Sequence, residues 1–118
     1  MTDLIKDVQL SVKKELARAA EKFGAKNNSD HESYAVILEE YEEARCAFDA
    51  FEWNLRSYWC GVKANTATKS QLQQCRRIAE EAAAEMIQVA AMCLKAEATV
   101  RDTPFKISSL ELGNRLST

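Results

Sequence analysis

Apolar residues recur at intervals of three and four along most of the chain, the spacing that places them on one face of an α-helix. The pattern predicts a first helix over residues 2–23, ended by Gly24, and a second over about 31–64. A third is predicted over about 70–100, because Pro104 disfavours helical geometry in the residues before it. The turns between these segments are short and polar, so consecutive helices are expected to run antiparallel.

The second predicted helix is the longest, roughly 50 Å at about 1.5 Å per residue, and it carries two distinct faces. Ser29 or Asp30 can cap its first turn. Its main apolar stripe, expected to be buried, consists of Tyr34, Ile37, Leu38, Tyr41, Ala44, Phe48, Phe51, Leu55, Tyr58, Trp59 and Val62. Its second face mixes small and apolar residues with acids: Val36, Glu40, Glu43, Ala47 and Asn54, flanked by Glu39 and Ala50. The pattern is equally typical of a face that meets another helix and of a solvated acidic face with incidental alanines.

The first and third helices each carry one apolar stripe that we expect to be buried. In the first helix it consists of Leu4, Ile5, Val8, Val12, Leu16, Ala19, Ala20 and Phe23. In the third helix it consists of Leu72, Cys75, Ile78, Ala79, Ala82, Met86, Val89, Cys93, Ala96 and Val100. Along the edge of this last stripe lie Glu81, Glu85, Gln88, Met92 and Lys95.

These elements predict an all-α fold, an antiparallel bundle of three long helices over residues 1–101. Residues 102–118 are expected to form a short C-terminal helix or a tail. The second helix cannot bury both of its faces within one copy, so we expect dimerisation to complete the bundle, as a homodimer or a dimer of dimers. The small residues Ala47 and Ala50, with Val36, mark the face on which a second copy is expected.

Charge and hydropathy exclude some classes of protein. The 16 basic and 18 acidic residues leave a net charge of −2 without a dense basic stretch, which argues against a duplex nucleic acid partner. The longest apolar-rich run, residues 86–94, is too short to span a membrane. The first residues carry acids where a signal peptide needs basic residues, so a cytoplasmic protein is expected. The four cysteines lack C-x-x-C spacing and are expected to be reduced and mostly in the core.

The acidic residues of the second and third helices are the best candidates for chemistry. Glu39, Glu40 and Glu43 form an E-E-x-x-E cluster. If the two helices are antiparallel neighbours, Glu85 lies within about 10 Å of this cluster along the axis and Gln88 within about 6 Å. Clustered carboxylates repel one another unless a cation neutralises them, and oxygen ligands alone suit Mg²⁺ or Mn²⁺. A ferritin-like di-iron centre is excluded, because it needs two E-x-x-H motifs and the chain has one histidine.

The two acidic motifs, within residues 31–43 and 85–92, resemble those of the MazG-like all-alpha nucleoside triphosphate pyrophosphohydrolases, particularly short bacterial and phage-type members. The motifs cover about a fifth of the chain, and the order of the helices extends the likeness over residues 30–100. The resemblance implies a magnesium-dependent helical bundle, usually a dimer or a dimer of dimers. Such enzymes cleave nucleotides between the α- and β-phosphates.

The resemblance also implies a role for each motif residue. Glu40, Glu43 and Glu85 are similar to metal ligands of the family, and Glu39 to a neighbouring carboxylate that orients water. Gln88 stands where the family pattern, E-x-x-D, has aspartate, so its ligand oxygen is neutral.

Two functions from different classes follow from these observations. The first is a Mg²⁺-dependent nucleotide pyrophosphohydrolase or a divergent relative, with Lys95 as a candidate contact for a substrate phosphate. The second is a non-catalytic interaction or assembly protein that keeps the helical bundle without the chemistry. The neutral Gln88 and the scarcity of evident phosphate-binding residues favour the second.

Overall fold

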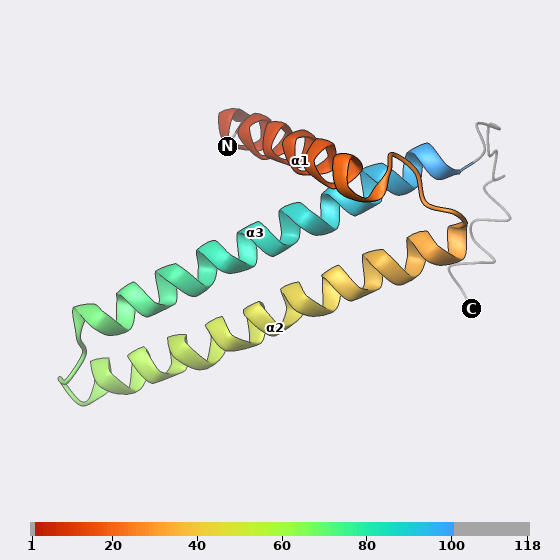
Figure 1. The fold of residues 1–118 in the computed structure, drawn as a ribbon. Helices are drawn as coiled ribbons and strands as arrows, with labels where there is room; N and C mark the ends of the chain where they lie inside the picture. Colours follow the sequence, from red (N-terminus) through yellow and green to blue (C-terminus); the bar gives the residue numbers. More distant parts are fainter. Residues whose placement is uncertain (1, 101–118) are drawn as a thin grey trace, which may run out of the picture.

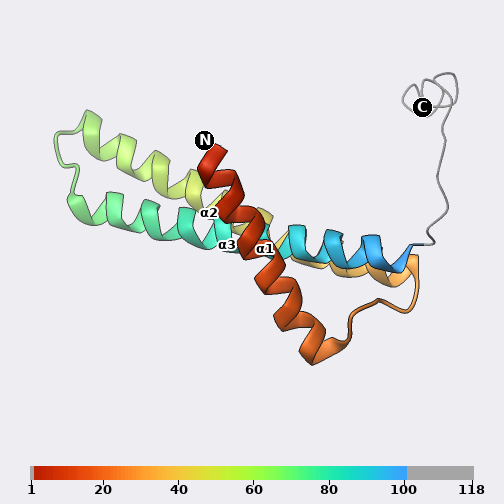
Figure 2. The same ribbon diagram turned by 90° about the horizontal axis from the view of Figure 1, so that it is seen from above.

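The computed structural model describes residues 2–100, which form three helices and, within this range, no β-strand. They are α1 (Thr2–Phe23), α2 (Asp30–Lys63) and α3 (Lys69–Thr99). The α2 and α3 helices run side by side as a long antiparallel hairpin, and α1 crosses this hairpin obliquely (Figure 1, Figure 2). The all-helical architecture and the helix bounds confirm the prediction from the sequence, whereas the expected C-terminal tail lies outside the described residues.

Local side-chain hydrogen bonds define the helix ends. Gly24 adopts a positive φ of 89° directly after α1, a backbone conformation that ends helices and favours glycine. At the start of α2 the hydroxyl of Ser29 accepts a hydrogen bond from the backbone N–H of Glu32 at 3.1 Å. At the start of α3, Thr68 and Gln71 form a reciprocal capping box. These caps explain why the helices begin within one residue of the predicted positions.

The α2 and α3 helices meet along a continuous seam whose residues alternate at spacings of four and three. This alternation is the heptad pattern of helices packed at a shallow angle. On α2 the seam consists of Ser33, Ile37, Glu40, Ala44, Ala47, Phe51, Asn54, Tyr58 and Gly61. On α3 it consists of Gln71, Cys75, Ile78, Ala82, Glu85, Val89, Met92, Ala96 and Thr99. None of these residues is exposed.

Small residues allow the two helices to approach closely. Ala44 is completely buried and Ala82 nearly so, at 4% exposure. At the tip of the hairpin, a Cβ atom on Gly61 would lie only 3.1 Å from the Cα atom of Ala67. The backbone of the connecting turn therefore passes so close to α2 that a larger residue at position 61 would require it to shift by a few tenths of an ångström.

This packing corrects the prediction of which α2 face is buried. The seam takes Glu40, Ala47 and Asn54 from the second face. From the main stripe it takes Ile37, Ala44, Phe51 and Tyr58, whereas the other residues of that stripe are exposed, including Tyr34 and Phe48. The reason is steric, since small side chains permit a closer helix contact than a row of aromatic rings. Of the dimer face expected through Val36, Ala47 and Ala50, Ala47 instead packs in the seam within one copy, and dimerisation itself stays a prediction.

The predicted stripes of the other two helices are also only partly correct. On α3, the stripe members outside the seam are exposed: Leu72, Ala79, Met86, Cys93 and Val100. On α1, the ends of the stripe are exposed, namely Leu4, Ile5 and Phe23, and the remainder is half-buried.

The cysteines are mostly exposed, which corrects the expectation that they lie in the core. Cys75 is buried in the seam, whereas Cys46, Cys60 and Cys93 are exposed, and all four are free. Among residues 2–100, no helix combines the length and the apolar character that crossing a membrane requires.

A buried hydrogen-bond network joins the α1–α2 connection to the end of α3. The side-chain amide of Asn27 donates to the Ser33 hydroxyl at 2.8 Å, and its backbone N–H donates to the Thr99 hydroxyl at 3.0 Å. The Thr99 hydroxyl in turn donates to the carbonyl of Lys95 at 3.2 Å. This anchor matters because α1 packs on α3 alone: none of its Cα atoms lies within 8 Å of one in α2 over the described range.

Asn27→Ala is therefore expected to destabilise the fold by about 1–2 kcal/mol, because it leaves the buried Ser33 hydroxyl without its donor. Asn28→Ala, at an exposed neighbour, is the matched control and should change the free energy of unfolding by less than about 0.5 kcal/mol. Urea denaturation of both variants measures the difference. Equal stabilities would contradict an anchoring role for Asn27.

Candidate metal centre

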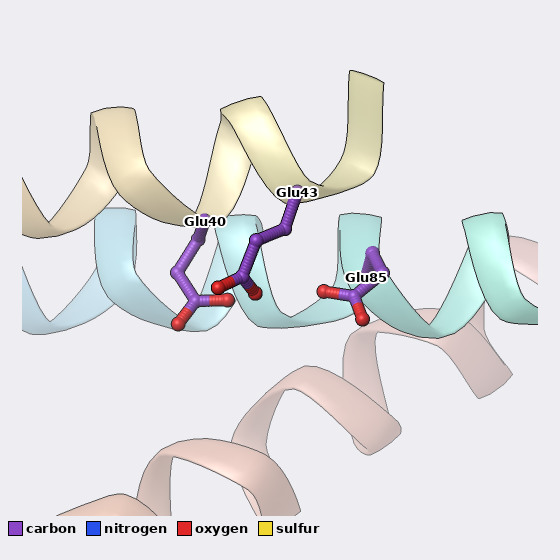
Figure 3. A group of neighbouring side chains, drawn as sticks. All are labelled: Glu40, Glu43 and Glu85. Atoms are coloured by element: carbon purple, nitrogen blue, oxygen red, sulfur yellow. The ribbon is translucent and has the colours of Figure 1, made fainter. Parts of the chain in front are cut away.

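Three carboxylates converge where the α2–α3 seam passes beneath α1. Glu40 and Glu43 lie one turn apart on α2, and Glu85 faces them from α3 (Figure 3). One oxygen from each carboxylate lies within 4.8 Å of the other two. The convergence expected from counting residues along an antiparallel hairpin is thus observed, and the role of the three as metal ligands stays a prediction.

Two of these carboxylates are held in positions where water cannot reach one of their oxygens. Glu40 and Glu85 are seam residues, and Oε2 of each is buried without a hydrogen-bond partner among the described residues. Burial, followed by the negative charges of Glu43, Glu85 and Glu39, raises the pKa of Glu40 above its usual value of 4.5. An ionised carboxylate in this position lacks compensation that a cation can supply.

A cleft of about 580 Å³ lies between α1 and the hairpin and reaches Glu40 of the cluster. It is lined by Glu15, Arg18, Ala19, Lys22, Phe23, Asn27, Glu32, Val36, Glu39, Glu40, Gln88, Met92 and Lys95. Glu40 is the carboxylate of the cluster that reaches the cleft, so it connects the candidate metal centre to this cavity.

Basic side chains from two helices line the cleft. From α1 come Arg18, which pairs with Glu15, and Lys22, whose ammonium lies 5.6 Å from the centre of the Phe23 ring. From α3 comes Lys95, which is only 6% exposed. The cleft thus combines a partly buried carboxylate with cationic side chains, an arrangement suited to a phosphate group that also contacts a divalent cation.

The other predicted site residues also line this cleft. Glu39 is exposed at its edge, Gln88 is half-buried on α3, and Lys95 is buried beside them. The sequence did not indicate Arg18 or Lys22, because α1 reaches the site only through its tertiary packing on α3. Their spacing of four residues places both on one side of α1, but many exposed helices share that signal.

The donor set fits a hard divalent cation. Carboxylate oxygens are preferred ligands of Mg²⁺ and Mn²⁺, and Mg²⁺ typically keeps several water ligands. The amide oxygen of Gln88, one turn beyond Glu85, is a further neutral donor in the neighbourhood.

Comparison with protein-family models, curated proteins and solved structures finds no match to this chain. The resemblance to MazG-like pyrophosphohydrolases therefore depends on the two acidic motifs and the order of the helices.

The raised pKa of Glu40 predicts that stability without divalent ions falls as the pH rises. The folded chain holds the Glu40 proton to a higher pH than the unfolded chain does. The stability that this proton contributes is therefore fully present below pH 4.5, and it is lost as the pH rises through the higher pKa of the folded chain. Glu40→Gln should remove this loss and raise the Tm at pH 7 above that of the natural chain, because an amide side chain does not ionise.

Thermal unfolding in chelator between pH 4 and pH 8 checks this prediction. Glu42→Gln, two residues further along α2 and on its exposed side, is the matched control and should keep the pH dependence of the natural chain. A Tm difference between Glu40→Gln and the natural chain that does not vary with pH would contradict the assignment.

Proposed function

We propose that the chain binds Mg²⁺ or Mn²⁺ through Glu40, Glu43 and Glu85 and acts as a nucleotide pyrophosphohydrolase or a divergent relative. The observation that carries the proposal is the convergence of three carboxylates, two of which have a buried oxygen without a partner in the described part of the chain. Such oxygens are costly in an apolar seam unless they serve a ligand.

The proposed reaction is attack by water on the α-phosphorus of a nucleotide. The bond from this phosphorus to the bridging oxygen breaks, which releases a nucleoside monophosphate and pyrophosphate. A bound divalent cation supplies charge neutralisation for the phosphates and acidifies a ligand water. Glu39, exposed at the edge of the cleft, is the proposed acceptor of the water proton.

The remaining cleft residues bind the phosphates in this proposal. Lys95 and Lys22 approach the cleft from different helices, so they are able to contact different phosphate groups. Arg18 offers a planar guanidinium, which matches phosphate oxygens in a two-point hydrogen bond. Gln88 contributes no charge, so the centre carries one negative charge fewer than the pattern it resembles.

A second candidate function is supported by a different observation. Much of the apolar surface of the hairpin is uncovered, including Tyr34 at 69% exposure and Trp59 at 56%. Contiguous apolar surface of this kind typically marks a protein interface. A helical assembly protein without catalysis would keep this surface and need no metal.

Metal binding separates the two candidates. We expect Mn²⁺ to raise the Tm of the natural chain, with a stabilisation of about 2.7 kcal/mol when the free ion is at 100 times its Kd. Glu43→Gln should abolish most of this rise, and Glu42→Gln should retain it, because Glu42 lies outside the cluster. A panel of nucleotides assayed for pyrophosphate release with Mn²⁺ then tests catalysis. Metal binding without pyrophosphate release from any nucleotide would leave the assembly function as the better account.

Gln88→Asp tests the consequence of the neutral side chain. If the missing charge limits the centre, the substitution should strengthen Mn²⁺ binding by roughly tenfold and raise hydrolysis, because it adds a carboxylate to the ligand set. If Gln88 instead makes structural hydrogen bonds, Gln88→Asp should destabilise the fold by roughly 1–3 kcal/mol without a gain in affinity. Calorimetric titration of both proteins with Mn²⁺ distinguishes these outcomes.

A further inference from the structure

The hairpin carries an uncovered apolar stripe that repeats every seven residues. Its α2 part, here called the α2 stripe, consists of Tyr34, Tyr41, Phe48, Leu55 and Val62, with Leu38 and Trp59 beside it. All seven side chains are exposed, Phe48 at 49% and Trp59 at 56%. A surface helix of a single copy rarely keeps an apolar heptad over this length without a partner.

The exposed α3 residues continue this surface. Each α2 residue at the seven-residue repeat directly follows a seam residue, and so do Leu72, Ala79, Met86, Cys93 and Val100 on the α3 side. In an antiparallel pair of helices, positions that follow the seam by one residue project to the same side of the pair. The two sets therefore form one apolar face, two helices wide.

This face lies on the opposite side of the hairpin from α1 and the cleft. The cleft residues Val36, Gln88 and Lys95 each directly precede a seam residue, which places them on the other flank. A partner on the apolar face therefore leaves the candidate metal centre accessible. The inference that follows does not depend on the proposed catalysis.

We propose that a second copy of this chain covers the apolar face, with its α2 antiparallel to the first and a two-fold axis at Phe48. The α2 stripe is self-complementary about this residue. Tyr41 then lies opposite Leu55 of the second copy, and Tyr34 opposite Val62. Leu38 lies within one residue, about 1.5 Å along the axis, of Trp59 of the second copy. Every apolar member of the stripe therefore meets an apolar residue at the isologous two-fold interface.

Charge complementarity selects the antiparallel arrangement. Leu38 and Trp59 share one heptad position on α2 with two charged residues, Arg45 and Glu52. The two-fold axis at Phe48 brings Arg45 to within one residue, about 1.5 Å along the axis, of Glu52 of the second copy, and Glu52 to within one residue of Arg45. A parallel pairing of α2 helices in the same register would instead bring like charges together, which is unfavourable.

The size of the surface is sufficient for a stable dimer. Residues 34–62 extend over roughly 40 Å, and two helices side by side are roughly 20 Å wide. The face therefore presents about 800 Å² per copy, the area that a specific protein interface typically buries on each partner. The result would be a four-helix bundle made from two hairpins.

Sedimentation equilibrium at micromolar concentration tests the dimer and its charge pairs. The natural chain is expected at twice its 13.3 kDa mass. Arg45→Glu should weaken association at least tenfold, and Arg45→Glu combined with Glu52→Arg should restore it. Arg77→Glu makes the same charge change on the exposed surface of α3 outside the stripe, so it should leave association unchanged. A 13.3 kDa species for the natural chain, or no rescue by the charge exchange, would overturn the proposal.

Thiol cross-linking tests the register in chains with Cys46, Cys60 and Cys93 replaced by serine. Tyr34→Cys combined with Val62→Cys should yield a covalent dimer with a short thiol-specific cross-linker, whereas Tyr34→Cys alone should not. Efficient linkage of Tyr34→Cys to itself would show a parallel arrangement and would equally refute the proposed one. Circular dichroism of each variant verifies that the helices persist, so that a loss of dimer is not a loss of fold.

Discussion

Close packing of small residues along the α2–α3 seam determines where the other features of this chain lie. Ala44 and Ala82 are buried there, and Gly61 allows the connecting turn to pass close to α2. Because the seam follows a heptad on both helices, it sets the register of the hairpin and therefore which residues face one another. The same packing leaves most aromatic residues of α2 exposed, with Phe51 and Tyr58 of the seam as exceptions, because small residues bring the two helices close together.

The seam also contains two carboxylates, although burying a charged group there does not stabilise the folded chain. Glu40 and Glu85 interrupt a run of small and apolar seam residues, and the negative charge of Glu43 is added beside them. Burial, followed by the negative charges of Glu43, Glu85 and Glu39, opposes ionisation of Glu40 and raises its pKa. The carboxylates thus lower the stability of the hairpin at this position, and such destabilising charged residues are typical of ligand-binding sites.

Much of the fold could be predicted from the sequence, because its helix ends are defined locally by residues such as Gly24 and Thr68. The convergence of Glu85 with the α2 acids was also predictable, since a short turn sets the register of an antiparallel hairpin. The face of α2 that packs against α3 could not be predicted, because apolar residues lie on two faces of this helix and their periodicity alone does not indicate which face is buried. The contribution of α1 to the cleft was equally hidden, since it depends on the Asn27 network and on packing against α3.

The proposed role of the three carboxylates that the seam brings together is to hold a divalent cation. An anomalous difference map from crystals grown with Mn²⁺ tests it most directly, because it locates the ion without reference to activity or stability. We expect a peak between the carboxylates of Glu40, Glu43 and Glu85, in contact with an oxygen of each. A map without a peak at these residues, at Mn²⁺ concentrations that saturate known magnesium sites, would contradict the proposed cation binding.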